Sequence, residues 1–284
     1  MGDALQAGFV AELLHAEAAR VGHDAARRLL ADNGVSSRWG GDALTTWARA
    51  LESRVHELAA SVAAQRPRDL ASRASWARAA FEARGIDPRD LVASLEALRD
   101  AALAAVPEDD ASLVSGVIDA AIDAARGPAP EVPAELSPDA PNGRLAGEYL
   151  LALLEGERLR ALALIRDAVA GGRASVPDVY QHVFIPVLRD LGRMWHLGEV
   201  NVAEEHFATA TTLISMSQIA PLAPRAPSNG RSVLAATVAG NTHEVGVRMV
   251  ADRLEWEGWR VVYLGPNVPA EDLAQAAVDF GVDV

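Results

Sequence analysis

Apolar side chains recur at helical spacing over most of the first 126 residues. One face of the first segment carries apolar residues three or four positions apart: Val10, Leu14, Ala18 and Val21. That spacing puts side chains on the same side of a helix. The pattern returns in later segments and predicts an all-helical N-terminal domain, residues 1–126, of about four or five helices.

The breaks between these helices carry start and stop signals. Asn33-Gly34 is expected to end the first helix, because both residue types tolerate the left-handed backbone of a helix end. Asp42 is expected to cap the second helix. Asp87-Pro88 supplies a cap followed by proline at the first helical position.

A proline-rich stretch separates this region from the rest of the chain. "GPAPEVPAELSPDAPNG", residues 127–143, holds five prolines and no aliphatic periodicity. It is predicted to form an extended, semi-rigid linker, and the domain boundary is placed there.

A second helical block follows, and the pattern then changes to alternating strands and helices. Breaks at Gly171-Gly172, Pro177 and Gly198 predict four helices in residues 144–222. In residues 228–284, "SVLAATV" and "RVVYLG" are typical of strands, and each precedes a helical segment, which indicates a right-handed parallel α/β unit. The final "VDV" is expected to open a third strand, so this Rossmann-like, flavodoxin-like domain is interpreted as incomplete.

Composition narrows the classes of function. The formal net charge of −13 opposes binding to the phosphate backbone of a nucleic acid. The absence of cysteine excludes thiolate metal sites and thiol nucleophiles. With no secretory signal pattern and no uninterrupted apolar run, a cytoplasmic protein without membrane contact is expected. The sequence contains no phosphate-binding, nucleophile-elbow or zinc-protease motif, which favours a sensor or binding protein over an enzyme.

The loop after the first predicted strand carries candidate chemistry. "AGNTHEVG" stands where ligands of parallel α/β sheets bind. His243, with Asn241 before it and Gly246 after it, resembles the D-x-H-x-x-G motif of cobalamin-binding domains. The resemblance implies that His243 is the lower cobalt ligand and that Asn241, Thr242 and Gly246 border the cofactor. Asn241 replaces the family's acidic residue and brings no charge, so weaker ligation, or compensation by Glu244, is expected.

The stretch "GRMWHLGEVNVAEEHFATATTL" gathers rare side chains around one helix break. Asn201 is expected to cap the second helix, with Glu204 completing a capping box. The other residues, taken singly, are typical of ordinary structural positions. Together, Trp195, nine residues and then Glu205-His206 resemble the W-x9-E-H motif of the CarH family of light-sensing, adenosylcobalamin-dependent repressors.

This resemblance, which includes the histidine after the tryptophan, implies a four-helix cap over the upper face of the corrin. Trp195 would lie against the adenosyl group, Glu205 would hydrogen-bond the nucleoside, and His206 would line the same pocket. His196 would approach cobalt after light breaks the Co–C bond, giving a bis-histidine state with His243.

The helix after the break is expected to divide its faces between cofactor and core. A run of small residues is expected to leave it open to close approach: Ala208, Thr209, Ala210, Thr211 and Thr212. Phe207, Ala210 and Ile214 are expected to face the core.

The N-terminal half departs from the CarH family, whose members begin with a winged-helix DNA-binding domain. Here the region is helical and the chain is acidic, so direct nucleic-acid binding is not expected. "SRASWARAAFEARGIDPRDLVASLEALRDAAL" weakly resembles the helical N-terminal domain of stressosome-type RsbR proteins, and a plain dimerisation bundle is the alternative. The expected partners are a second copy of the chain, a downstream signalling protein, or both.

Three functions stay open at this stage. The first is an adenosylcobalamin-based photosensor in which ligand exchange at cobalt moves the helical cap. The second is a corrinoid methyl carrier that serves a methyltransferase, which would have no use for Trp195 and the Glu205-His206 pair. The third is a degenerate scaffold that no longer binds cobalamin, motivated by Asn241.

Overall fold

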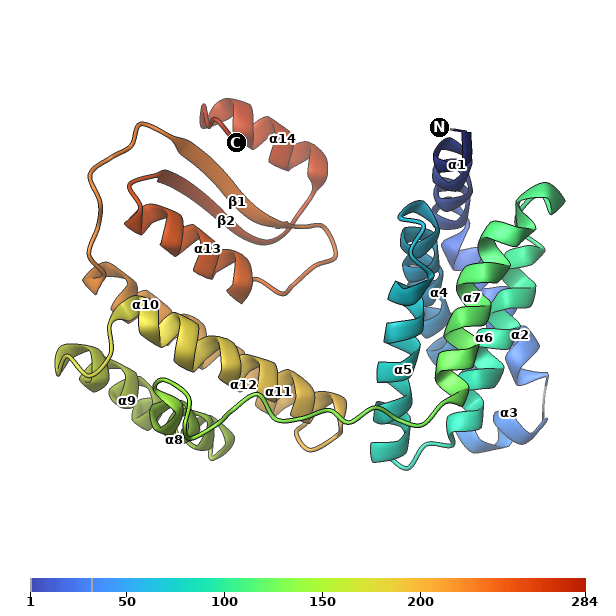
Figure 1. Cartoon of the computed structure of the whole chain (residues 1–284), viewed down its shortest axis with the longest axis horizontal. Helices are drawn as coiled ribbons and strands as arrows, with labels where there is room; N and C mark the ends of the chain where they lie inside the picture. The colour runs from blue at the N-terminus through green and yellow to red at the C-terminus, as the bar shows by residue number, and fades with distance from the viewer. Residues whose placement is uncertain (1, 32) are drawn as a thin grey trace. The chain divides into compact units, whose positions relative to one another are not determined.

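The computed structural model describes residues 2–31 and 33–284 (Figure 1). Its contacts divide the chain into two compact units, which meet in sequence between Val132 and Pro133. The first unit is helical, and the second combines a helical block with a parallel α/β part. The predicted fold class, mainly α followed by a Rossmann-like parallel unit, is confirmed.

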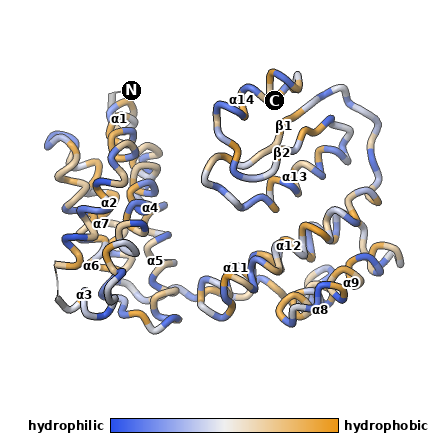
Figure 2. Tube along the Cα trace, turned by 180° about the vertical axis from the view of Figure 1, so that it is seen from behind, coloured by the Kyte–Doolittle hydropathy of each residue, from blue (hydrophilic) through white to orange (hydrophobic). Residues whose placement is uncertain are grey.

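The first unit has seven α-helices and one 3-10 turn within its described residues. They are α1 (Gly2–Ala16), α2 (Ala18–Leu30), α3 (Asn33–Trp39), α4 (Ala43–Ala63), α5 (Pro67–Ala83), α6 (Pro88–Leu103), η1 (Glu108–Asp110) and α7 (Ala111–Arg126). Figure 2 shows apolar positions interleaved with polar ones along these helices. Their apolar faces form one core, built largely from alanine, valine and leucine.

The prediction of four or five helices was wrong because the first segment divides in two. The break falls at Glu17, yet its backbone N donates to Leu13 O at 3.0 Å and its O accepts from Val21 N at 2.9 Å. Helical spacing therefore continues across the break, and the periodicity hides it. Asn33 begins α3 instead of ending a helix.

Of the two helix caps predicted in this unit, one is present and one is not. Asp87 accepts a hydrogen bond from the backbone N of Arg89 at 2.9 Å, with Pro88 at the first helical position, so this cap is confirmed. Asp42 precedes α4, but its side chain caps no backbone N–H. That prediction was wrong.

The second unit begins with four helical segments. They are α8 (Gly143–Leu154), α9 (Arg158–Ala170), a continuous run made of α10 (Val176–Val179), the π-helix η2 (Tyr180–Phe184) and α11 (Ile185–His196), and then α12 (Val202–Ile219), which ends in the 3-10 turn η3 (Ala220–Leu222). Their buried faces share a core with Trp256 of the α/β part. Helical block and α/β part are thus packed together within this unit.

The middle of the linker is bound to this helical block through Asp190 of α11. Asp190, 3% exposed, accepts the backbone N–H groups of Glu135 and Leu136 at 3.1 and 3.2 Å. Its third partner is Arg193 Nε at 2.9 Å. A buried carboxylate with three donors is well satisfied, so residues 135–136 are fixed to α11.

The α/β part consists of β1 (Ser232–Val238), α13 (Val245–Trp256), β2 (Arg260–Val268) and α14 (Ala270–Asp279). The strands are parallel, in register from Ser232 opposite Arg260 to Ala235 opposite Tyr263, and the register shifts after Ala235. On the other edge of β1, Leu234 N donates to Val284 O at 2.8 Å, and Val284 N to Ser232 O at 3.3 Å. Residues 283–284 thus hydrogen-bond this edge of β1, although β1 and β2 are the only strands assigned among the described residues, so the third strand stays a prediction.

The expected division of faces on α12 is confirmed for Phe207, which packs against the core, and was wrong for Ala210 and Ile214. Ala210 is exposed and Ile214 is 37% exposed, whereas Thr211 and Thr212 are buried. The hydroxyl of Thr212 hydrogen-bonds Ala208 O at 2.8 Å and Tyr149 Oη at 3.1 Å. Burial of these hydroxyls costs little because they are paired, and hydropathy alone gives no sign of such partners.

Among residues 2–31 and 33–284, no helix combines the length and apolar character needed to cross a membrane.

Candidate functional site

The loop between β1 and α13 is held by hydrogen bonds from two strand ends. Thr237 Oγ1 donates to Asn241 O at 2.5 Å and accepts from Asn267 N at 2.9 Å. The side chain of Asn267, a residue with φ of 59° at the end of β2, accepts from Gly240 N at 2.7 Å. These bonds fix the loop where parallel α/β proteins bind ligands.

His243 lies exposed in this loop with its imidazole oriented by Asn241. Asn241 Oδ1 accepts from His243 N at 2.9 Å and lies 3.2 Å from Nδ1 of the ring. Because an amide oxygen only accepts, the second contact requires a proton on Nδ1. The lone pair of Nε2 is then available to a metal.

Two further loop residues lie beside this histidine. Thr242 is exposed, and its carbonyl accepts from Glu244 N at 2.9 Å. Gly246 is in the first turn of α13, and a Cβ built on it would have no heavy atom within 4 Å. The helix start is therefore open on that side.

Glu244 is directed to a tyrosine instead of the histidine. Its Oε2 accepts from Tyr263 Oη at 2.8 Å, which contradicts the expectation that Glu244 compensates for Asn241. Burial, and then the adjacent Glu244 carboxylate, raise the pKa of Tyr263. Arg248 lies over the Tyr263 ring, 5.1 Å from its centroid, and its Nε is 2.8 Å from Asp252 Oδ1.

Asp252 joins this chain of contacts to the helical block. It is 3% exposed, and its Oδ2 accepts from Tyr180 Oη at 2.6 Å. Burial, reinforced by that carboxylate, raises the pKa of Tyr180. The Tyr180 ring also packs edge-on against Trp256, at 5.0 Å between centroids. Tyr180 begins the π-helix η2, so the loop is linked through side chains to an irregular helical turn.

The predicted corner lies between α11 and α12, and its cap is confirmed. Asn201 Oδ1 accepts from the backbone N of Ala203 and of Glu204, at 2.8 and 3.1 Å. Glu204 Oε2 in return accepts from Asn201 N at 2.6 Å. This capping box sets where α12 starts relative to the turn.

The four remaining corner residues differ sharply in exposure. Trp195 is 39% exposed, and His196, which follows it, is only 6% exposed. Glu205 lies in the first turn of α12, where its Oε2 is 2.7 Å from His206 Nδ1 and its Oε1 accepts from Thr209 Oγ1 at 2.7 Å. Three of them thus present polar or aromatic groups at the surface, and His196 does not.

The loop and the corner lie toward the same end of the second unit. The C-terminal end of α13 is joined to the end of α12, where Trp256 Nε1 donates to Ala220 O at 3.2 Å. In Figure 1, both α13 and α12 run from their N-terminal ends at the lower right toward their C-terminal ends at the upper left. Val245 and Met249 of α13 pack against the core of the helical block along the way. The starts of α13 and α12, which carry the two motifs, therefore lie on the same side.

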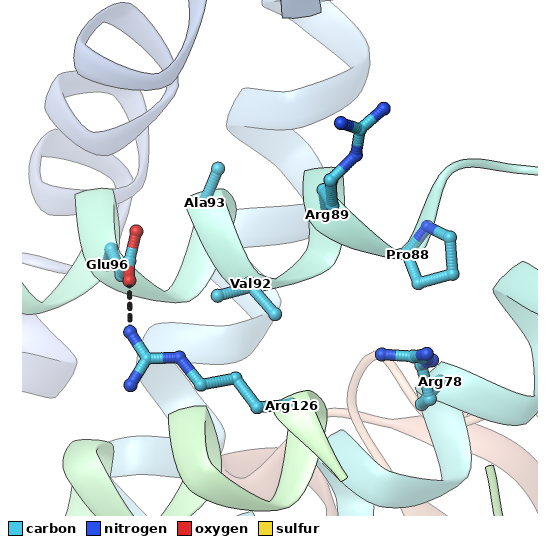
Figure 3. A pocket seen from close by; sticks show the side chains of 7 residues that line it. All are labelled: Arg78, Pro88, Arg89, Val92, Ala93, Glu96 and Arg126. Atoms are coloured by element: carbon cyan, nitrogen blue, oxygen red, sulfur yellow. Dashed lines mark hydrogen bonds and ion pairs between the residues drawn. The ribbon is translucent and has the colours of Figure 1, made fainter. Parts of the chain in front are cut away.

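Two surface hollows in the described part of the chain are lined by other residues, although the second includes Phe207, which follows His206 on α12. One, of about 440 Å³, is in the first unit between α5, α6 and the end of α7 (Figure 3). The other, of about 680 Å³, is lined by residues 156–160 and Phe207. In the first hollow Arg78, Arg89 and Arg126 each lie 2.6 Å from a carboxylate oxygen, so their charge is already balanced.

Sequence reasoning missed the side chains that support the loop: Thr237, Asn267, Tyr263, Arg248, Asp252 and Tyr180. The one available signal was rarity, because the chain has only three tyrosines. All three place their hydroxyl on a polar side chain: Tyr149 on Thr212, Tyr180 on Asp252 and Tyr263 on Glu244. A tyrosine in an alanine-rich helical protein thus marks a hydrogen bond between elements.

Comparison with known families defines the class to which this part of the chain belongs. Residues 145–219 and residues 231–284 each match a model described as a B12 binding domain. The second unit is therefore a pair of B12-binding domains, a helical one followed by an α/β one.

The particular domains that it resembles are those of CarH-type regulators. The chain is 32% identical over 124 residues to the HTH-type transcriptional repressor CarH of Myxococcus xanthus, covering 42% of this chain and 40% of that protein. It is 34% identical over 100 residues to the repressor CarA of the same organism, covering 35% and 33%. The chain thus spans less than half the length of these relatives, and its second unit is a CarH-like cobalamin-binding domain.

More distant similarities are to corrinoid proteins. A corrinoid protein of Desulfitobacterium hafniense (strain Y51) is 23% identical over 144 residues, covering 49% of this chain and 66% of that one. The structure of the Methanosarcina barkeri monomethylamine corrinoid protein aligns with a TM-score of 0.43 and 18% identity, covering 49% and 65%.

Proposed function

We propose that the second unit binds adenosylcobalamin between its helical block and its α/β part, and that the protein is a light-responsive regulator rather than an enzyme. The observation that carries this proposal is the placement of two motifs on one side of one unit. The oriented imidazole of His243 supplies a metal ligand just before α13, and the Trp195 corner supplies an aromatic and polar surface between α11 and α12.

The donor set fits the group. A single oriented imidazole suits a metal whose equatorial positions are filled by its own macrocycle, as they are for cobalt in a corrin. When bound, adenosylcobalamin supplies a Co–C bond that light breaks. The chain's own part is to hold the His243 proton on Nδ1 through Asn241, and to leave room at Gly246 for the corrin edge.

The corner residues take the upper face in this proposal. Trp195 provides a flat apolar surface for the adenosyl group, and it is sufficiently exposed to do so. Glu205 accepts hydrogen bonds from the nucleoside, and His206 lines the same pocket, since both lie at the start of α12. His196 would be the second imidazole available to the metal once light has broken the Co–C bond, and it would have to leave its buried position to serve as a ligand.

The output is proposed to pass through protein contacts. The relatives are named as transcriptional repressors, and by analogy this chain is assigned a part in signal transduction that regulates transcription. Its first unit is helical and its net charge is −13, which favours a second copy or a downstream signalling protein over DNA as the immediate partner.

A corrinoid methyl carrier is the second candidate, favoured by the similarity to the Desulfitobacterium corrinoid protein. The photosensor and the methyl carrier differ in the contacts that they require at the upper face of the corrin. A methyl group is too small to need Trp195, so a carrier keeps its affinity for methylcobalamin when that ring is removed.

An absorption experiment tests the proposal. The purified chain is mixed with adenosylcobalamin in the dark and desalted, and its spectrum is recorded before and after green light. A photosensor retains the corrin, and its spectrum changes to that of a bis-histidine form on illumination. Retention of methylcobalamin alone favours the carrier, and a colourless protein contradicts both and leaves the scaffold.

Trp195→Ala sharpens the choice, with His182→Ala as the control outside the site. The photosensor loses about tenfold or more in affinity for adenosylcobalamin in the tryptophan variant, since an aromatic contact is removed. Equal affinity in both variants contradicts the proposed role of the corner.

A further inference from the structure

Two histidines in the first unit form a cluster that the cobalamin site does not use. His15 is in the last turn of α1, and His56 is in the second half of α4. Their Nδ1 atoms are 2.9 Å apart, and their ring centroids are 4.6 Å apart with an interplanar angle of 56°. Both rings are accessible, since His15 is exposed and His56 is partly buried.

We propose that His15 and His56 form a binding site for a divalent late transition-metal ion that joins α1 to α4. Imidazole nitrogen is a favoured ligand of such ions, and the order of affinity places copper, nickel and zinc above manganese and iron. The proposal concerns the first unit and does not depend on cobalamin binding.

The distance between the two nitrogens is close to that of a shared ion. Two imidazole nitrogens on one tetrahedral zinc, each at ~2.05 Å, stand ~3.3 Å apart. The pair at 2.9 Å needs to open by only ~0.4 Å, which small rotations of two exposed side chains provide. In the absence of metal, one ring donates its Nδ1 proton to the other, and the same lone pairs face the ion once both protons are on Nε2.

The chain also places carboxylates one turn before each histidine. Glu12 precedes His15 by three positions on α1, and Glu52 precedes His56 by four on α4, so each shares a helix face with its histidine. Among the described residues, no three His, Cys, Asp or Glu side chains are already grouped for a metal. The two histidines therefore supply two ligands, and water molecules, or water and one of these carboxylates, fill the two remaining positions of a tetrahedral ion.

Zinc is the probe, because it has no redox chemistry and prefers this geometry. The full chain, without a histidine tag, is titrated with Zn²⁺ by calorimetry at neutral pH. Histidines of the second unit can also bind zinc, so the readout is the difference between variants. His15→Ala and His56→Ala are compared with His23→Ala, which removes an exposed histidine on the neighbouring α2.

Wild type and His23→Ala are expected to bind one more equivalent of Zn²⁺ than either variant of the pair, or to bind it about tenfold or more tightly. Saturating zinc is also expected to raise the unfolding temperature of the first unit by about 3 °C or more in these two proteins only. Equal stoichiometry, affinity and unfolding temperature in all four proteins would overturn the proposal and leave the pair as a hydrogen bond. Circular dichroism confirms that each variant is folded, and His56→Gln provides a second substitution at the more buried position.

Discussion

The β1–α13 loop and the α11–α12 corner both present a histidine, in opposite circumstances. His243 is exposed and donates a hydrogen bond to Asn241 Oδ1, whereas His196 is 6% exposed at the end of α11. A ligand that is already oriented loses little entropy on binding, and a buried one needs the protein to rearrange first. In the proposed site, His243 would thus be oriented before the cofactor binds, whereas use of His196 would itself require a conformational change.

Removal of the prepared ligand is expected to have the largest effect. In His243→Ala no side chain of the loop replaces the imidazole, and the affinity for cobalamin is expected to fall by about 100-fold or more. The measurement is the dissociation constant from absorption titration in the dark, with His182→Ala as the control. Unchanged affinity would mean that His243 is not a cobalt ligand.

Removal of the buried histidine is expected to separate binding from switching. His196→Ala should leave the dark affinity nearly unchanged, abolish the bis-histidine spectrum after green light, and cost about 1–3 kcal/mol of stability through the cavity that it creates. Spectra before and after illumination, together with urea unfolding, give both quantities. A normal light-induced spectrum in this variant would contradict the role of His196.

The buried hydrogen bond from Tyr180 to Asp252, which joins the helical block to the α/β part, leads to a third prediction. Tyr180→Phe leaves Asp252 with Arg248 alone and is expected to destabilise the second unit by about 1–3 kcal/mol. Tyr263→Phe, whose hydroxyl bonds the less buried Glu244, is the matched control and should cost less. Urea unfolding of both variants measures the difference in the free energy of unfolding. Equal losses of stability would show that the burial of the hydrogen bond does not determine its contribution.

The same contact predicts a dependence on pH. Folding raises the pKa of Tyr180, so the folded state holds the phenol proton more tightly than the unfolded state does. Its contribution is complete below the unfolded pKa of about 10 and is lost as pH rises above that value. The free energy of unfolding should fall less steeply between pH 9 and 11, or about that range, in Tyr180→Phe than in wild type.

The smallest predicted effect concerns the partner of the prepared histidine. Asn241→Asp keeps both hydrogen bonds and adds a negative charge beside Nδ1, which makes the ring a stronger ligand. The affinity for cobalamin is expected to rise by about two- to tenfold. A dark titration of this variant against wild type measures it, and a loss of affinity would show that the amide is itself required.

The sequence was a good guide where structure is local. The Asn201 capping box, the Asp87 cap and the order of strands and helices all depend on residues close in the chain, and all were predicted. The burial of Thr212 was not, because its hydroxyl is paired with Tyr149, more than sixty positions away. The direction of Glu244 was missed for the same reason, since its partner is on the next strand.

The attachment of the linker to Asp190 shortens the part of the linker that is not bound to the second unit. With residues 135–136 bound to α11, only residues 127–134 are left as a tether, and eight residues extend to at most about 28 Å. The anchor is six positions before His196, on the same helix. A displacement of α11 that exposes His196, as the proposed function requires, would therefore also displace residues 135–136 of the linker.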